Sequence, residues 1–165
     1  SIMTRYSFLI QYQGKNYGGS QIQFDEDGME RPIPTIQGEL EKAICTLKRV
    51  KPTHNNPRPI KTVFSGRTDA GVNSVGQTVH VDFDEPIVAS RFIRAINGLL
   101  PKDISISDVC EVPPTFHSQK SAKSRQYRYV FINRSQRNAF DGDLMRIRYD
   151  LDIERMNKAL NYLKG

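Results

Sequence analysis

The chain has 165 residues, 38% of them hydrophobic, and a formal net charge of +6, which is typical of one cored globular domain with part of a second. No apolar run is long enough to span a bilayer and no charged and apolar leader opens the chain, so we expect neither a membrane protein nor a secretory signal. The two cysteines, Cys45 and Cys110, match no metal-binding spacing, which predicts two reduced core thiols in a cytoplasmic protein.

The first third of the chain predicts a strand, a long irregular segment and a helix. Residues 5–13 alternate large apolar side chains with others, as a strand with one buried face does. A glycine-rich segment follows, and residues 24–34 are acidic and contain two prolines, which predicts a surface loop. A helix is expected from about Thr35, a suitable N-cap. Its apolar face is predicted to contain Ile36, Leu40, Ala43, Ile44 and Leu47.

The middle of the chain predicts three strands and one helix. After a proline-rich loop (HNNPRP), a short strand is expected at 62–64 and a longer one at 77–83. Residues 90–100 predict a helix capped by Ser90 and stopped by Pro101. A further strand is expected at 104–112.

The order β-α-β-β-α-β predicts an α+β domain of ferredoxin-like (RRM-like) type, an antiparallel sheet with helices on one face. RNA-binding domains of this plan use the second, free face of the sheet. Another strand is expected at 125–133 and a helix from about Asp152. We therefore expect one domain over residues 1–140, and the start of a second α/β domain, otherwise missing, over residues 141–165.

Basic residues are concentrated in two windows. Residues 42–68 contain seven Lys or Arg and no acid, and residues 112–140 contain six and no acid, whereas the rest of the chain carries a net charge of −7. Such segments on an acidic body are typical of a protein that binds RNA, and the alternative is a pair of solvated faces. The candidate RNA-binding residues are Lys48, Arg49, Lys51 and Arg58 in the first window and Lys123, Arg125 and Arg128 in the second.

A glycine-bounded loop, SGRTDAGV, precedes the strand at 77–83. Its glycines permit positive φ angles and the close approach of a ligand. Thr68 and Asp69 can each accept hydrogen bonds from nearby amides and Arg67 supplies a cation, influences that favour an ionised carboxylate at Asp69. Such a carboxylate suits a nucleophile, a general base or a turn, but the spacing Gly-x-x-Asp-x-Gly alone is a weak signal and favours a structural turn.

The segment HVDFDE suggests a rival enzyme class. Strand alternation places His80, Asp82 and Asp84 on one face, and an imidazole with two carboxylates can bind a divalent cation. A metal-dependent nuclease is therefore one alternative. The other is a polar outer face without a metal.

Five segments resemble the tRNA pseudouridine synthase A family in the family's own order, and they cover nearly the whole chain. GRTDAGVNSVGQTVHVDF resembles the active-site segment of that family. The other four are YQGKNYGGSQIQ, TIQGELEKAI, INGLLPKDI and FHSQKSAKSRQYRYVFIN. Because these matches are independent of one another, they are far more specific than any single motif.

The resemblance implies that Asp69 is the catalytic carboxylate, that Arg67 helps to hold or displace the flipped base, and that Tyr127 contacts the target uracil. The implied reaction is the isomerisation of uridine to pseudouridine in the anticodon stem-loop of tRNA. It needs no metal and no cofactor, and the implied full-length enzyme is a homodimer.

The chain also departs from the family. The family usually has Asp at the position of Gln13, an aromatic residue at Ser20 and His at Asn73. Family members continue into a second half that completes the cleft. We therefore expect an N-terminal fragment that is inactive alone, and an RNA-binding module without catalysis is the non-enzymatic alternative.

Overall fold

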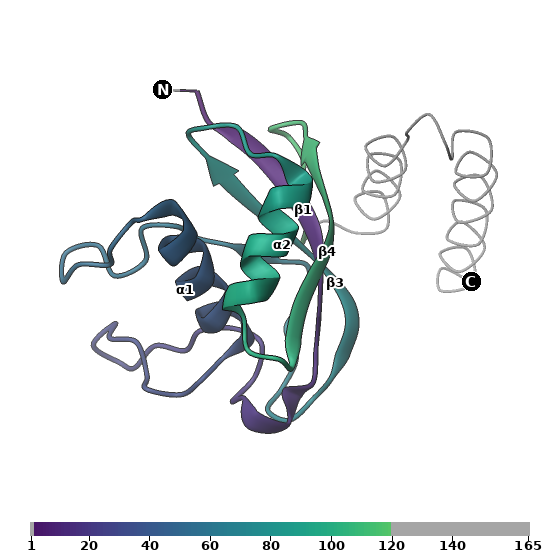
Figure 1. The fold of residues 1–165 in the computed structure, drawn as a ribbon. Coiled ribbons are helices and arrows are strands. Elements are labelled where there is room, and N and C mark those ends of the chain that lie inside the picture. The colour runs from purple at the N-terminus through teal and green to yellow at the C-terminus, as the bar shows by residue number, and fades with distance from the viewer. Residues whose placement is uncertain (1, 120–165) are drawn as a thin grey trace.

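The computed structural model describes residues 2–119, which form an antiparallel sheet covered by two helices (Figure 1). The strand order in the sheet is β2-β3-β1-β4 and the order along the chain is β-α-β-β-α-β, so the ferredoxin-like prediction is confirmed. The elements are β1 (Thr4–Tyr12), η1 (Gly14–Asn16), α1 (Ile36–Lys48), β2 (Val63–Phe64), β3 (Ser74–Phe83), α2 (Ala89–Leu99) and β4 (Ile104–Val112). The strand expected at 125–133, the later helix and the domain boundary after residue 140 lie outside the described residues.

Helix α1 begins as predicted. The Thr35 side chain accepts a hydrogen bond from the Gly38 N–H at 3.0 Å, which satisfies one of the free donors of the first turn. The helix ends where Arg49 adopts a left-handed φ of 57°. Four residues of the predicted apolar face are buried, but Leu47 is 36% exposed, because it lies in the last turn, where the helix has fewer neighbours.

Helix α2 has a different cap from the predicted one. The N-cap is Val88, whose backbone is extended and which makes no side-chain hydrogen bond to the helix. The Ser90 prediction is wrong because Ser90 lies inside the first turn. The helix ends before Pro101, as predicted. Asn97 then ties it to β4, since its side-chain oxygen accepts from the Ile106 N–H at 2.8 Å and its amide donates to the Ile106 carbonyl at 3.0 Å.

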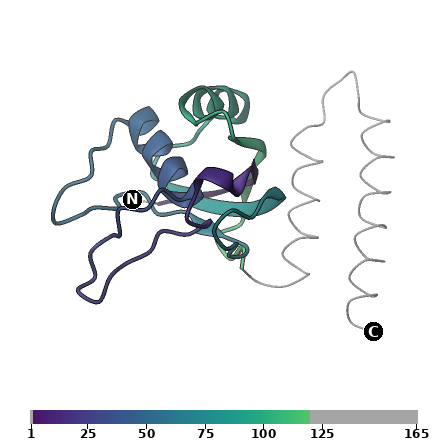
Figure 2. The same ribbon diagram turned by 90° about the horizontal axis from the view of Figure 1, so that it is seen from below.

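The core lies between the sheet and the two helices, which cover the same face (Figure 2). Phe8 of β1 faces Val79 of β3 in the register of the sheet, and the Phe8 ring lies 6.0 Å from that of Phe92 on α2. Each fully buried side chain of this size contributes about 2 kcal/mol. Cys45 and Cys110 are both buried and are not joined in a disulfide, as predicted. Within the described residues, no helix is long and apolar enough to cross a bilayer.

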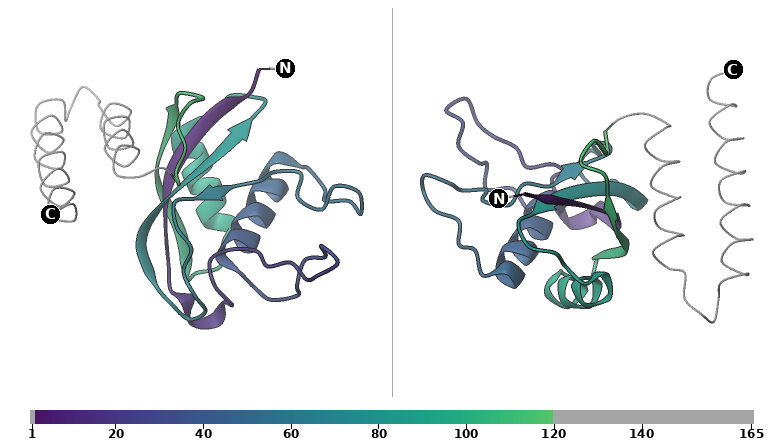
Figure 3. Two further views of the ribbon diagram at one scale, coloured as in Figure 1. Left: turned by 180° about the vertical axis from the view of Figure 1, so that it is seen from behind. Right: turned by 90° about the horizontal axis from the view of Figure 1, so that it is seen from above.

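The second face of the sheet is partly covered, so the expectation that it is free is wrong for one end. This face, opposite the helices, is turned toward the viewer in the view from behind (Figure 3, left). The segment after β4 folds back over it, and Phe116 is only 4% exposed. Phe116 packs there with Leu9, Cys110 and Val112. The irregular sequence PPTFHSQ has no strand or helix periodicity that would predict this cover.

Ser118 fastens this covering segment to the sheet. Its backbone N–H donates to His80 Nδ1 at 3.1 Å and its hydroxyl donates to the Val63 carbonyl at 2.8 Å. Because Nδ1 accepts a hydrogen bond, it carries no proton, so His80 is neutral. Burial lowers the pKa of His80 to about 4, the charges of Arg5 and His117 act in the same direction, and Asp82 opposes them.

The lowered pKa predicts that folding stability depends on pH through His80. An unfolded histidine, with a pKa near 6.5, binds a proton between about pH 6.5 and pH 4 that the folded state does not accept. The stabilisation is therefore present above about pH 6.5 and is lost as the pH falls. The unfolding free energy should decrease by about 2 kcal/mol between pH 7 and pH 5 on account of this group.

Urea unfolding of wild type and His80→Gln at both pH values checks this expectation. The variant should be less stable at pH 7 but should show a smaller difference between the two pH values. An equal pH dependence in the two proteins would contradict the neutral, buried state of His80.

Candidate active site

The loop of residues 65–73, which we call the GRTDAG loop, connects β2 to β3 and packs against the loop that follows β1. The pairing is closest at Thr68. Its carbonyl accepts a hydrogen bond from the Ser20 N–H at 3.1 Å, and its own N–H donates to the Ser20 hydroxyl at 2.8 Å. Ser20 is fully buried. The two segments are therefore joined directly beside Asp69.

Two glycines permit this close packing. Gly71 has a φ of 80°, as the sequence suggested for one of the loop glycines, and its N–H donates to the Tyr17 carbonyl at 3.3 Å. A Cβ at Gly14 would lie 2.0 Å from the Val72 carbonyl oxygen, so only glycine fits there. The Gly14 N–H donates to the Asn73 side-chain oxygen at 2.8 Å.

A second set of hydrogen bonds lies beneath the loop, at the end of β1 and the start of β3. The Tyr12 hydroxyl lies 2.7 Å from Thr68 Oγ1 and accepts from Gln77 Nε2 at 2.7 Å. Gln77 Oε1 accepts from the Gly66 N–H at 3.1 Å. The sequence suggested that the Thr68 side chain accepts from a backbone amide, whereas its partner is the Tyr12 hydroxyl.

Asp69 is exposed, although Thr68 directly before it and Gly71 two residues after it are held by hydrogen bonds. Its backbone carbonyl accepts from the Val72 N–H at 3.2 Å. Within residues 2–119, its carboxylate accepts no hydrogen bond and forms no ion pair with Arg67, which is also exposed. The expected amide contacts of the carboxylate are thus absent from the described part.

The loop that follows β1 is anchored at the far side of the sheet. The Tyr17 hydroxyl donates to Asp103 Oδ1 at 2.6 Å, and the Gln13 N–H donates to the Asp103 carbonyl at 2.9 Å. Burial and this hydrogen bond raise the pKa of Tyr17 well above its usual value, so the phenol keeps its proton. Asp103 belongs to the INGLLPKDI segment and Tyr17 and Gln13 belong to the YQGKNYGGSQIQ segment, so two of the matched segments are in contact.

The three departures from the family pattern fall in this structure as follows. Ser20 and Asn73 both accept hydrogen bonds that join the paired loops, whereas the Gln13 side chain is exposed. Sequence reasoning treated Ser20 and Asn73 only as departures. Their short polar side chains are a signal for turn and loop hydrogen bonding that the sequence does contain.

The four candidate RNA-binding residues of the first basic window differ in their contacts. Arg58 forms a bidentate ion pair with Glu41, at 2.8 and 2.7 Å, and the Lys48 ammonium lies 4.5 Å from the centre of the Phe83 ring. The other two, Arg49 and Lys51, are exposed and have no charged partner in the described region.

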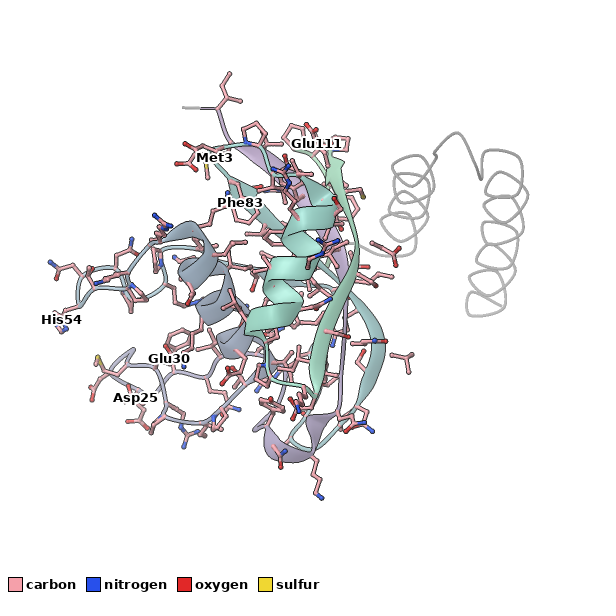
Figure 4. All side chains as sticks on the ribbon, in the orientation of Figure 1. Met3, Asp25, Glu30, His54, Phe83 and Glu111 are labelled. Carbon is pink, nitrogen blue, oxygen red and sulfur yellow. The ribbon has the colours of Figure 1, made fainter. Side chains whose placement is uncertain are left out.

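Arg49 and Lys51 line a groove of about 850 Å³ between α1 and the loop of residues 49–60. Glu30 lines the other side of this groove, on a loop that projects beyond α1 as the loop with His54 does (Figure 4). The groove therefore has a basic and an acidic side. The other candidates, Lys123, Arg125, Arg128 and Tyr127, lie outside the described residues.

Two of the three residues of the metal alternative, Asp82 and His80, have other partners. Asp82 forms a bidentate ion pair with Arg5, at 2.8 and 3.1 Å, which holds the pKa of Asp82 below its usual value. His80 is bound to Ser118. Across residues 2–119, no group of three or more His, Cys, Asp or Glu side chains is arranged to hold a metal ion.

Comparison with known proteins finds curated relatives that match this chain along almost its whole length. The chain is 38% identical over 162 residues to the tRNA pseudouridine synthase A of Bacillus licheniformis, covering 98% of this chain and 60% of the relative. It is 36% identical over 165 residues to that of Anoxybacillus flavithermus (99% and 61%) and 35% identical over 164 residues to that of Oceanobacillus iheyensis (99% and 59%). No protein-family model matches the chain. The chain thus spans about 60% of the length of these curated relatives.

Proposed function

We propose that this chain, a homologue of the tRNA pseudouridine synthases A, carries the catalytic carboxylate of an enzyme that isomerises uridine to pseudouridine in tRNA. The observation that carries the proposal is the exposed carboxylate of Asp69 on a loop whose neighbouring residues are held by hydrogen bonds. A reagent must be accessible to its substrate, and its backbone must be held in place. The anticodon stem-loop is the proposed site on the tRNA.

The reaction rearranges the substrate without oxidation or reduction. The C1′–N1 bond breaks, the uracil turns over, and a C1′–C5 bond forms, while C5 loses a proton and N1 gains one. Asp69 acts as the nucleophile toward the ribose or the base, or as the base that removes the proton. No metal or cofactor takes part in this scheme.

The target nucleotide must leave the base stack before Asp69 can reach it. We assign Arg67, two residues before Asp69, to holding or displacing the flipped base, and Tyr127 to contacting the uracil. Arg49 and Lys51 bind phosphates of the tRNA arm, because among the four candidate RNA-binding residues of the first basic window they are the exposed ones without a charged partner in the described region. Lys48, Arg58, Lys123, Arg125 and Arg128 are the remaining proposed RNA contacts. The full-length enzyme is proposed to act in the cytoplasm as a homodimer.

A second candidate function is RNA binding without catalysis. It is favoured by one observation, that the chain spans about 60% of the length of its relatives. The two candidates predict the same binding of tRNA and differ in whether Asp69 takes part in a reaction in the full-length protein.

Release of tritium from a tRNA transcript labelled at C5 of uridine tests the proposal. The full-length protein should release tritium and should do so equally in excess chelator, whereas the 165-residue chain alone should bind the transcript without releasing tritium. Cleavage of the transcript, or loss of activity in chelator, would contradict the proposal in favour of the nuclease. Release by the 165-residue chain would overturn the non-catalytic alternative.

A further inference from the structure

The hydrogen bonds beneath the GRTDAG loop run through two buried side chains, Tyr12 and Gln77, which are 4% and 9% exposed. Neither of them is part of the loop, and both are buried below the surface of the protein. They connect the end of β1 and the start of β3 to the loop at two points, Gly66 and Thr68. These two residues flank Arg67, and Thr68 directly precedes Asp69.

The direction of each hydrogen bond in this set follows from its chemistry. The Gly66 N–H can only donate, so the atom of Gln77 that faces it is the side-chain oxygen, at 3.1 Å. The amide nitrogen of Gln77 therefore faces Tyr12, whose hydroxyl accepts its hydrogen at 2.7 Å. The phenol proton of Tyr12 is left for Thr68 Oγ1, also at 2.7 Å. The set is thus a directed chain from Gly66 through Gln77 and Tyr12 to Thr68.

Thr68 is the most tightly held residue of the loop. Its side chain accepts from Tyr12, its N–H donates to Ser20 and its carbonyl accepts from the Ser20 N–H. Asp69, one residue later, has an exposed carboxylate without a hydrogen bond within residues 2–119. The orientation of Thr68 therefore determines the position of the Asp69 carboxylate relative to the substrate.

We propose that Tyr12 is a positioning residue for Asp69, acting through Thr68, and that Gln77 sets the direction of its hydrogen bond. This inference rests on the proposed function. A buried tyrosine of β1 would then affect the chemical step. The reason is that displacing a reacting group by about 1 Å lowers the rate on the order of 100-fold. Tyr12 makes no contact with substrate in this scheme.

The first test compares Tyr12→Phe with Tyr6→Phe in the full-length protein. Tyr6 is a matched control, because it lies on the same strand, is 5% exposed, and its hydroxyl accepts one hydrogen bond, from the Ile87 N–H at 3.1 Å. Tyr12→Phe should lower kcat for tritium release roughly ten- to a hundred-fold, with KM changed by less than about two-fold. Tyr6→Phe should lower the melting temperature by a similar amount but leave kcat at the wild-type value.

The second test is a double-mutant cycle that places the effect at Thr68. Thr68→Val removes the acceptor, and Tyr12→Phe combined with it should reduce kcat no further than the worse single variant does. Thr68→Ser keeps the hydroxyl and should recover most of the rate that Thr68→Val loses. The comparison of Thr68→Val with Thr68→Ser holds even if Tyr12→Phe folds poorly, because these two variants leave the buried tyrosine intact.

Each outcome decides between a positioning and a structural role. A wild-type kcat in Tyr12→Phe, an equal loss in Tyr6→Phe, or losses that multiply in the double variant would overturn the inference while leaving Asp69 as the proposed reagent. Wild-type activity of Asp69→Asn would instead overturn the proposed function itself.

Discussion

The Asp69→Asn variant of the full-length protein should lose tritium release from C5-labelled tRNA by on the order of 1,000-fold or more. Asparagine has nearly the same size but cannot act as a carboxylate nucleophile or base. Because Asp69 is exposed and makes no side-chain hydrogen bond within the described residues, the substitution removes no contact that holds the fold. The affinity for tRNA, measured by filter binding at a fixed salt concentration, should therefore remain close to that of the wild type.

Asp84→Asn is the matched control for this experiment. Asp84 is also exposed and forms no ion pair within residues 2–119, and it is one of the three residues that the metal-dependent alternative requires. We expect Asp84→Asn to keep wild-type activity. Loss of activity in Asp84→Asn together with full activity in Asp69→Asn would reject the assignment and revive the metal alternative.

The largest effect on stability is expected at Glu41, a buried carboxylate of α1. It accepts hydrogen bonds from Arg58 at 2.8 and 2.7 Å and from the N–H and hydroxyl of Thr62 at 2.9 and 2.8 Å. Glu41→Gln removes the charge and leaves the guanidinium of Arg58, whose side chain is 19% exposed, without its partner. The expected loss is about 3 kcal/mol of unfolding free energy, the lower end of the range for breaking a buried pair, because Arg58 retains some access to water.

Urea unfolding at pH 7 measures this loss, and Glu39→Gln is the control. Glu39 lies on the same helix, is only half-buried and forms no ion pair in the described region, so its replacement should change stability by less than about 0.5 kcal/mol. Equal stabilities of the two variants would show that the Glu41 pair does not hold the loop of residues 49–60 on α1.

Where the sequence has a clear period or cap, it predicts the local structure well. Thr35 caps α1 because its side-chain oxygen, just before the apolar helical face, accepts a hydrogen bond from a backbone N–H of the first turn, which has no partner within the helix. The strands at β1, β3 and β4 follow from alternation, although β3 begins three residues before the predicted Gln77. Ser90 fails as a cap because a side-chain preference cannot fix the first residue of a helix to within one or two positions.

The contacts of the site are less predictable, because they join residues that are distant in the chain. Tyr12 reads as a core residue by alternation and Gln77 as the start of a strand, and only the register of β1 against β3 brings them together beneath Thr68. The covering of the sheet face by Phe116 cannot be predicted from the sequence for a related reason. It depends on how an irregular segment returns to the sheet, and no local pattern encodes that path.

The central claim is that the Asp69 carboxylate performs an isomerisation on tRNA, and a single-turnover experiment tests it most directly. Full-length protein in excess over a C5-tritiated transcript removes any effect of binding affinity, and nucleoside analysis of the same sample identifies the product. The wild type should release one tritium for each pseudouridine formed, and Asp69→Asn should form neither on the same timescale. Pseudouridine formation by Asp69→Asn at the wild-type rate would contradict the account.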